Sequence, residues 1–73
     1  MTKPIYVAWV RDEEENITSE FESTRKSEIK KFALKSIKDG ADSVDIYYWS
    51  KAFGDRYIGS FYADGEMPRL FNK

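Results

Sequence analysis

The chain has 73 residues, which suits one small domain, so residues 1–73 are expected to fold as a single domain. It contains no cysteine and no histidine, which excludes disulfide bonds, the usual structural zinc sites and the Ser-His and Cys-His arrangements of nucleophilic enzymes. The formal net charge of −1 provides no long-range attraction to nucleic acid or to a membrane.

The first part of the chain predicts a β-hairpin. Residues 5–10 (IYVAWV) are β-branched, aromatic or small, which is typical of a strand. A charged turn at 12–16 follows. Residues 17–22 then alternate between two sides, one of which carries Ile17, Ser19 and Phe21. The other side carries two glutamates, which indicates a half-buried edge strand protected by charge.

The longest apolar run in the chain is the segment 5–10, which is far shorter than the roughly 20 residues that a membrane-spanning helix requires. The chain also begins without the long apolar region of a secretory signal. Together with the absence of cysteine, these features predict a cytoplasmic protein without a membrane span.

Residues 27–39 predict a helix. Apolar and small residues fall on one arc at the spacing i, i+3, i+4, i+7 and i+8, namely Ile29, Phe32, Ala33, Ser36 and Ile37. Leu34 lies at the border of this arc. Either the pair Ser23-Thr24 or Ser27 is expected to cap the helix, and Gly40 is expected to end it with a positive φ angle.

The rest of the chain predicts a second strand pair. Residues 43–50 alternate, so that Val44, Ile46 and Tyr48 would face the helix. A loop at 51–55 leads to a strand at 56–63, whose buried side is ambiguous because aromatic residues occupy both parities. After the turn Asp64-Gly65, the tail 66–73 is expected to add a short fifth strand or to fold back on the sheet.

The predicted fold class is therefore α+β: an antiparallel sheet of about four strands in the chain order β-β-α-β-β, with one helix packed on one face. The expected oligomeric state is a monomer or a small homo-oligomer.

Charge is segregated along this fold, with acidic residues between 11 and 22 and basic residues between 25 and 38. The acidic part is densest in the predicted turn, at Asp12, Glu13, Glu14 and Glu15. This cluster could serve acid–base catalysis or divalent metal binding, or it could be a solvated turn. The solvated turn is favoured, because the carboxylates are adjacent and lack the alternate spacing of a calcium loop. No metal site, no cofactor site and no catalytic residues are therefore predicted.

The basic part forms one face of the helix, at Lys31, Lys35 and Lys38. It is either the solvated side of an amphipathic helix or a stripe that contacts phosphates or an acidic protein surface. Three lysines would support only weak, salt-sensitive binding to nucleic acid.

Aromatic residues are predicted on the sheet face that the helix leaves uncovered. Tyr47 and Trp49 would lie there, joined by Trp9 and by Tyr57 or Tyr62. An exposed aromatic patch of this kind typically marks an interface. The alternative is that the tail folds over these rings through Leu70 and Phe71.

The order of these segments resembles that of small ββαββ proteins of bacteriophages and mobile elements, anti-CRISPR inhibitors among them. The resemblance covers residues 5–66 and rests on the hairpin 6–22, the lysine-rich helix and the strands around VDIYY and YIGSFYADG. It implies an inhibitor that occupies a nucleic-acid site or a partner site on a host or defence complex.

The first functional hypothesis is thus a non-catalytic protein-binding module, a phage-encoded inhibitor whose partner is a host protein or ribonucleoprotein complex. Asp12–Glu15 or the helix lysines would steer the encounter, and the sheet aromatics would anchor it. The alternative is a nucleic-acid-binding accessory protein that uses the helix lysines and the aromatics, with stacked bases on the sheet. A purely structural or self-associating protein is the third hypothesis.

Overall fold

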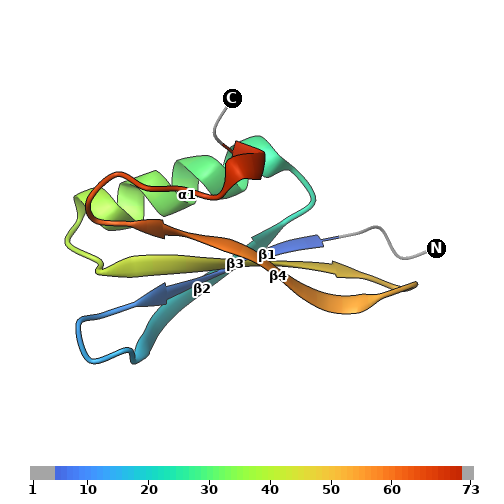
Figure 1. Cartoon of the computed structure of the whole chain (residues 1–73), viewed down its shortest axis with the longest axis horizontal. Helices are drawn as coiled ribbons and strands as arrows, with labels where there is room; N and C mark the ends of the chain where they lie inside the picture. The colour runs from blue at the N-terminus through green and yellow to red at the C-terminus, as the bar shows by residue number, and fades with distance from the viewer. Residues whose placement is uncertain (1–4, 72–73) are drawn as a thin grey trace.

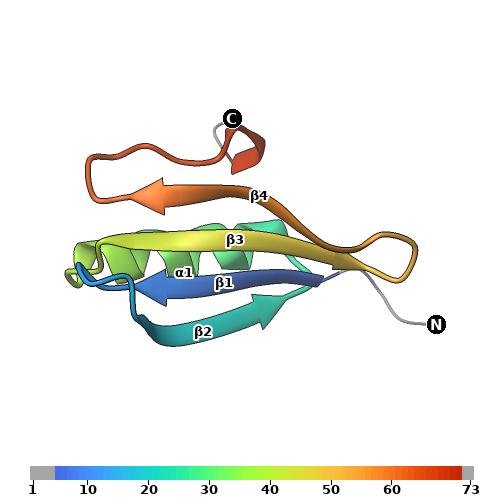
Figure 2. The same cartoon turned by 60° about the horizontal axis from the view of Figure 1, so that its bottom comes forward.

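The computed structural model describes residues 5–71; residues 1–4 and 72–73, the ends of the predicted 1–73 domain, lie outside this described part. The elements follow the predicted chain order: β1 (Ile5–Arg11), β2 (Ile17–Ser23), α1 (Lys26–Lys38), β3 (Ser43–Ser50), β4 (Gly54–Tyr62) and a 3₁₀ turn η1 (Arg69–Phe71). The strands form one antiparallel sheet in the order β2-β1-β3-β4 (Figure 2). With α1 on one face of the sheet, the predicted α+β fold is confirmed (Figure 1).

The core lies between α1 and the two central strands. Ala8 in β1 pairs with Ile46 in β3, and both are fully buried beneath Ile29 and Ala33 of the helix. Since side chains alternate along a strand, every second residue of β1 and β3 faces this core. Val44 is also fully buried, so the predicted facing of residues 43–50 is confirmed.

The helix ends as predicted and begins differently. Gly40 has a φ of 109°, and the hydrogen bonds Gly40 N–H to Ile37 O and Ala41 N–H to Ser36 O form a Schellman motif. At the other end the N-cap residue is Arg25. The predicted caps were wrong: Ser27 lies inside the first turn, and Thr24 precedes the N-cap.

Ser23 instead links the end of β2 to the start of the helix. Its hydroxyl accepts a hydrogen bond from Arg25 N–H at 3.0 Å and donates one to the carboxylate of Glu28 at 2.9 Å. The acid of the first helical turn therefore reaches back to a serine that precedes the helix.

β2 occupies the edge of the sheet, as its glutamates predicted, but its first residue differs from expectation. The register shifts between Val10 and Arg11, so that Ser19 pairs with Val10 while Ile17 pairs with Arg11. This bulge separates Ile17 from the side that carries Ser19 and Phe21 and leaves Ile17 51% exposed.

β4 starts at Gly54, two residues earlier than predicted, because Ser50 pairs with Gly54 and the hairpin is shorter than the predicted loop. Its last residue is Tyr62 instead of Ala63. A second register shift, opposite Ile46 and Tyr47 of β3, makes the odd-numbered residues of β4 change from one face of the sheet to the other. This explains why the sequence pattern left the buried side of this strand ambiguous. On one side of the shift Phe61 faces the core, and on the other Tyr57 faces away from it.

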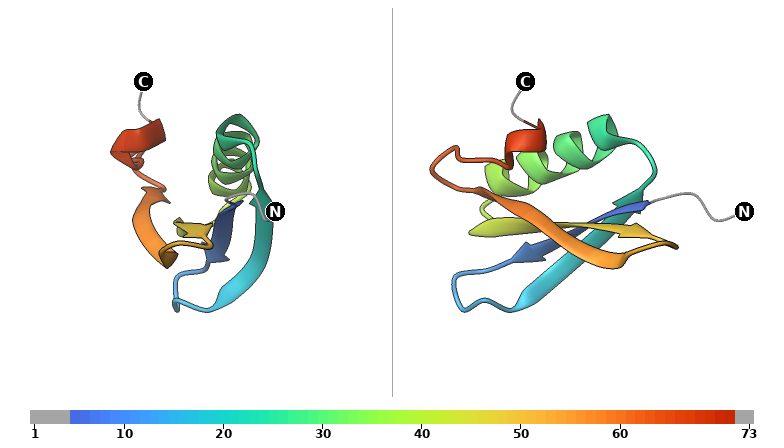
Figure 3. Two further views of the ribbon diagram at one scale, coloured as in Figure 1. Left: turned by 90° about the vertical axis from the view of Figure 1, so that its right-hand side faces the viewer. Right: turned by 45° about the vertical axis from the view of Figure 1, so that its right-hand side comes forward.

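The tail folds back on the helix side of the sheet and adds no fifth strand within the described residues. Phe71 is 3% exposed and packs against the rings of Phe61 and Tyr6 at centroid distances of 5.4 and 6.0 Å. Figure 3 shows η1 and α1 on the same side of the curved sheet. The alternative that Leu70 and Phe71 cover the other face is therefore wrong.

The helix α1 has 13 residues, and the described part of the chain holds no helix that is both long and apolar enough to cross a membrane.

Candidate functional site

The sheet face opposite α1, called the open face below, is left uncovered by every described segment of the chain (Figure 3). Its central residues are given by the pairings of β1, β3 and β4, because directly paired residues share a face. They are Val7, Trp9, Arg11, Asp45, Tyr47, Trp49, Tyr57, Ser60 and Tyr62. From β2, Glu20 and Glu22 complete the face.

A row of three rings crosses the open face. The ring centroids of Trp9 and Tyr47 are 4.7 Å apart, and those of Tyr47 and Tyr57 are 5.4 Å apart. Tyr57 is 55% exposed and Tyr62 43% exposed, while Trp49 is half-buried. The sequence correctly placed Tyr47 and Trp49 on this face, with Trp9 and Tyr57 joining them and Tyr62 on the same side.

Next to the rings lies a polar network that the sequence analysis missed. Arg11 Nε donates to Oδ2 of Asp45, and the two side chains are 27% and 16% exposed. Ser60, only 5% exposed, donates to Oδ1 of Asp45 at 2.7 Å, and Tyr57 shares a short hydrogen bond with the Ser60 hydroxyl. The network ties β1, β3 and β4 together and holds Tyr57 in place.

The network also shifts the pKa values of two of its members. The hydrogen bond to Asp45, followed by the charge of Asp45, raises the pKa of Arg11 above its usual value, so the guanidinium group is charged at neutral pH. The hydrogen bond shared with Ser60 lowers the pKa of Tyr57, but burial and the neighbouring Tyr62 and Asp45 outweigh it. The pKa of Tyr57 is therefore raised, and the phenol is neutral at pH 7.

The open face carries more acid than base. Its described carboxylates are Glu20, Glu22, Asp45 and Asp55, and its described cation is Arg11, which Asp45 engages. Glu20 accepts a hydrogen bond from Nε1 of Trp9 at 3.2 Å, so one carboxylate is attached directly to the aromatic row. The face is therefore aromatic with a negative rim.

The acidic turn Asp12–Glu15 lies at the tip of the β1–β2 hairpin. One carboxylate oxygen of Asp12 accepts the backbone N–H of Glu14 and of Asn16, both at 2.9 Å, and thereby shapes the turn. Glu13, Glu14 and Glu15 are exposed. No group of three or more Asp or Glu residues within 5–71 could hold a metal ion. Three of the four carboxylates of this turn are therefore open to solvent.

The helix lysines lie on the other side of the molecule from the rings. Lys31, Lys35 and Lys38 are exposed on the arc of α1 opposite Ile29 and Ala33, which pack on the sheet. The structure therefore does not bring the predicted lysine and aromatic residues together on one surface.

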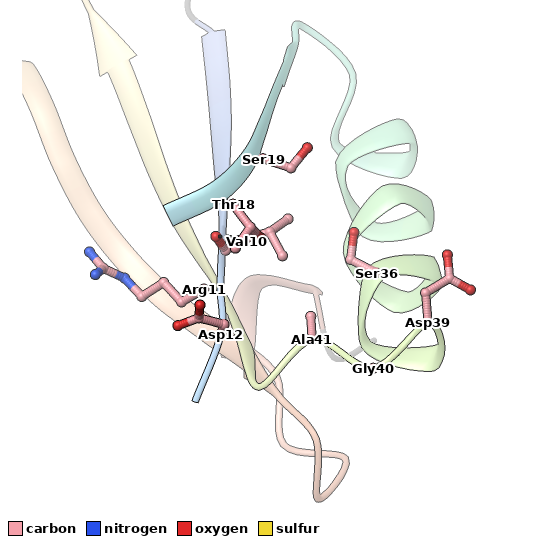
Figure 4. A pocket seen from close by; sticks show the side chains of 9 residues that line it. All are labelled: Val10, Arg11, Asp12, Thr18, Ser19, Ser36, Asp39, Gly40 and Ala41. Carbon is pink, nitrogen blue, oxygen red and sulfur yellow. Dashed lines mark hydrogen bonds between the residues drawn. The ribbon is translucent and has the colours of Figure 1, made fainter. Parts of the chain in front are cut away.

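A groove of about 330 Å³ lies between the start of β2 and the end of α1 (Figure 4). Its lining includes the hydroxyl groups of Thr18, Ser19 and Ser36. Asp12 and Asp39 lie at its two rims, and Asp12 is already engaged by its own turn. The groove is thus lined by hydroxyl groups, with carboxylates at its rims.

Comparison of the chain with protein-family models, with curated proteins and with solved structures found no match.

Proposed function

We propose that this protein is a non-catalytic protein-binding module that contacts its partner through the open face of the sheet. The observation that supports this most directly is the row Trp9–Tyr47–Tyr57, which lies on an uncovered sheet next to a fixed polar network. Aromatic side chains on a rigid element provide large contact area at a small cost in conformational entropy, which is why they dominate binding hot spots.

The charge of the open face favours a partner surface that contains arginine or lysine. A guanidinium or ammonium group can stack on Trp9 or Tyr47 and pair with Glu20 or Glu22 beside them. Phosphate groups would be repelled by the same carboxylates. A protein, and not a nucleic acid, is therefore the proposed partner, which includes the protein component of a ribonucleoprotein complex.

Inhibition is the second part of the proposal. A non-catalytic module that covers a basic patch on a host protein would act by occupying that site. The acidic turn Asp12–Glu15 extends the negative surface at the hairpin tip and would speed the encounter by electrostatic attraction.

Affinity capture with matched variants tests the proposal. The tagged protein is incubated with a lysate of the cells in which it is naturally made, beside the double variant Tyr47→Ala/Tyr57→Ala and the control Leu34→Ala. Leu34 is 43% exposed on the helix, away from the open face. Proteins captured by the unmodified chain and by Leu34→Ala should be lost from the double variant, provided circular dichroism shows that the double variant is folded. Equal capture by all three would exclude the open face as the binding surface.

A further inference from the structure

We propose that the outer edge of β2 is a second recognition site, which receives an extended segment of a partner protein as an added antiparallel strand. The segment would carry lysine or arginine toward Glu20 and Glu22, and an apolar residue toward Phe21. This inference goes beyond the proposed function, since it concerns strand pairing along the outer edge of β2, although Glu20 and Glu22 also belong to the open face.

The edge itself is available. β2 is the outermost strand, and within residues 5–71 it pairs with β1 alone. Alternate residues of such a strand direct their N–H and C=O groups outward, where they can pair with another extended chain. The bulge opposite Val10 and Arg11 confines the regular part of this edge to residues 19–23.

A hollow lies on each side of this edge. One hollow, of about 340 Å³, is lined by Val7, Glu20, Phe21 and Glu22. The other, also about 340 Å³, is lined by Phe21, Glu28, Lys31, Phe32 and Lys35. Both include Phe21, so they flank one point of the strand. Because side chains of an added strand alternate between the two faces, consecutive residues would enter the two hollows in turn.

The chemistry of the two hollows differs. Glu20 and Glu22 make the first one acidic, and it suits lysine or arginine. In the second, the rings of Phe21 and Phe32 stack at a centroid distance of 4.8 Å and an interplanar angle of 18°. An apolar side chain would cover this half-buried ring pair, and Lys31 and Lys35 at its border would attract a carboxylate.

The direction of α1 relative to β2 determines the order in which an added strand would carry its charged and apolar residues. Phe21 stacks on Phe32 while Ser23 contacts Glu28, so residues earlier in β2 lie beside residues later in α1. Lys35, one turn after Phe32, is thus on the side of Ser19. From its N-terminus onward, an added antiparallel strand would then carry a basic residue opposite Glu22 and an apolar residue opposite Phe21. A basic residue opposite Glu20 and an acidic residue opposite Ser19 would follow. The sequence Lys-Leu-Lys-Glu meets this pattern.

A second copy of the chain fits the edge poorly. Antiparallel pairing of two β2 strands about Phe21 would place Glu20 of one copy opposite Glu22 of the other, and pairing about Glu20 would oppose two identical glutamates. Like charges directly opposite one another destabilise a strand pair. The edge is therefore assigned to a different chain.

The probe is the peptide acetyl-Thr-Lys-Leu-Lys-Glu-Thr-amide, titrated to millimolar concentration into the ¹⁵N-labelled full chain. We expect saturable shifts of the amide signals of residues 19–23. The charge-reversed chain Glu20→Lys/Glu22→Lys should bind this peptide about tenfold or more weakly and should bind the partly reversed peptide Thr-Glu-Leu-Glu-Glu-Thr more tightly. A peptide methylated on the backbone nitrogens that point toward β2 should not bind, because it cannot donate to the strand.

Two results would overturn the inference: absence of saturable shifts at the edge, or binding that survives backbone methylation and charge reversal. Sizing chromatography that shows a dimer abolished by Glu20→Lys would assign the edge to a second copy and would also overturn it. The control Phe53→Ala, at a 74% exposed residue in the turn between β3 and β4, should leave the peptide affinity unchanged. Loss of partner capture by the open-face variants with retained peptide binding, or the reverse, separates this inference from the proposed function.

Discussion

Pro68 lies directly on Gly59. A Cβ atom added at Gly59, where φ is 138°, would lie 2.9 Å from the Cβ and 3.1 Å from the Cγ of Pro68. This close approach fastens the tail to the helix side of β4 and places Phe71 on the core. The apolar residues of the tail therefore pack on one face of the sheet, and the tail does not cover the aromatic row on the other face.

Gly59→Ala should destabilise the protein through both backbone strain and collision with Pro68. Gly65→Ala is the matched control, because Gly65 also has a positive φ, 102°, but an added Cβ there meets nothing within 4 Å. We expect the positive φ alone to lower the free energy of unfolding of the control by about 1 kcal/mol. Gly59→Ala should lower it by about 1–3 kcal/mol more. Urea unfolding of both variants measures the difference. Equal losses would mean that the tail does not rest on Gly59 in solution.

Ser60→Ala should weaken the polar network of the open face. The buried hydroxyl of Ser60 donates to Asp45 and contacts the phenol of Tyr57, so its removal costs about 1 kcal/mol and frees the Tyr57 ring. Ser27→Ala, at an exposed helix position, should change the free energy of unfolding by less than about 0.5 kcal/mol. Urea unfolding compares the two serines, and a Ser60→Ala protein as stable as the unmodified chain would contradict the network.

Stability should fall at alkaline pH, in part through Tyr6. Burial, followed by the neighbouring Tyr48, raises the folded-state pKa of Tyr6 above the ordinary value of 10.0. The folded state thus favours the neutral phenol. The resulting stabilisation is fully present below pH 10 and is lost as the pH rises through the higher folded-state pKa. Since Tyr6→Phe cannot ionise, its free energy of unfolding should decline less between pH 9 and pH 11 than that of the unmodified protein. If the free energies of unfolding of the two proteins declined equally with pH, the assignment to Tyr6 would be refuted.

Nucleic acid should not bind appreciably. The lysines Lys31, Lys35 and Lys38 are separated from the rings by the whole thickness of the helix and sheet, and the rings are bordered by carboxylates. A gel-shift assay with single-stranded and double-stranded oligonucleotides at low salt should give no retarded band. A retarded band that disappears at higher salt and in the variant Lys31→Glu/Lys35→Glu would instead support the nucleic-acid alternative.

Local sequence pattern predicted the elements and the two faces of the sheet. The alternation in residues 43–50 placed Tyr47 and Trp49 on the open face, because a strand with Val44 and Ile46 in the core must turn its other residues away. The helical spacing of Ile29 and Ala33 similarly identified the face of α1 that packs on the sheet.

The features that the sequence did not predict depend on register between distant segments. Arg11 and Asp45 are 34 positions apart and meet only because of the way β1 pairs with β3. The bulges that expose Ile17 and divide β4 have no signature in the alternation pattern. The tail has a few apolar residues without a period, so nothing local indicated that Phe71 would join the helix side.

The most direct test of the central claim uses the only two tryptophans in the chain, Trp9 and Trp49, which both lie on the open face. The protein is labelled with 5-fluorotryptophan and observed by ¹⁹F NMR before and after addition of the captured partner. We expect both signals to shift on binding and their sensitivity to exchange of H₂O for D₂O to decrease, because the partner covers the rings. Unchanged signals from a protein whose slower diffusion proves that the partner is bound would show that the open face is not where it binds.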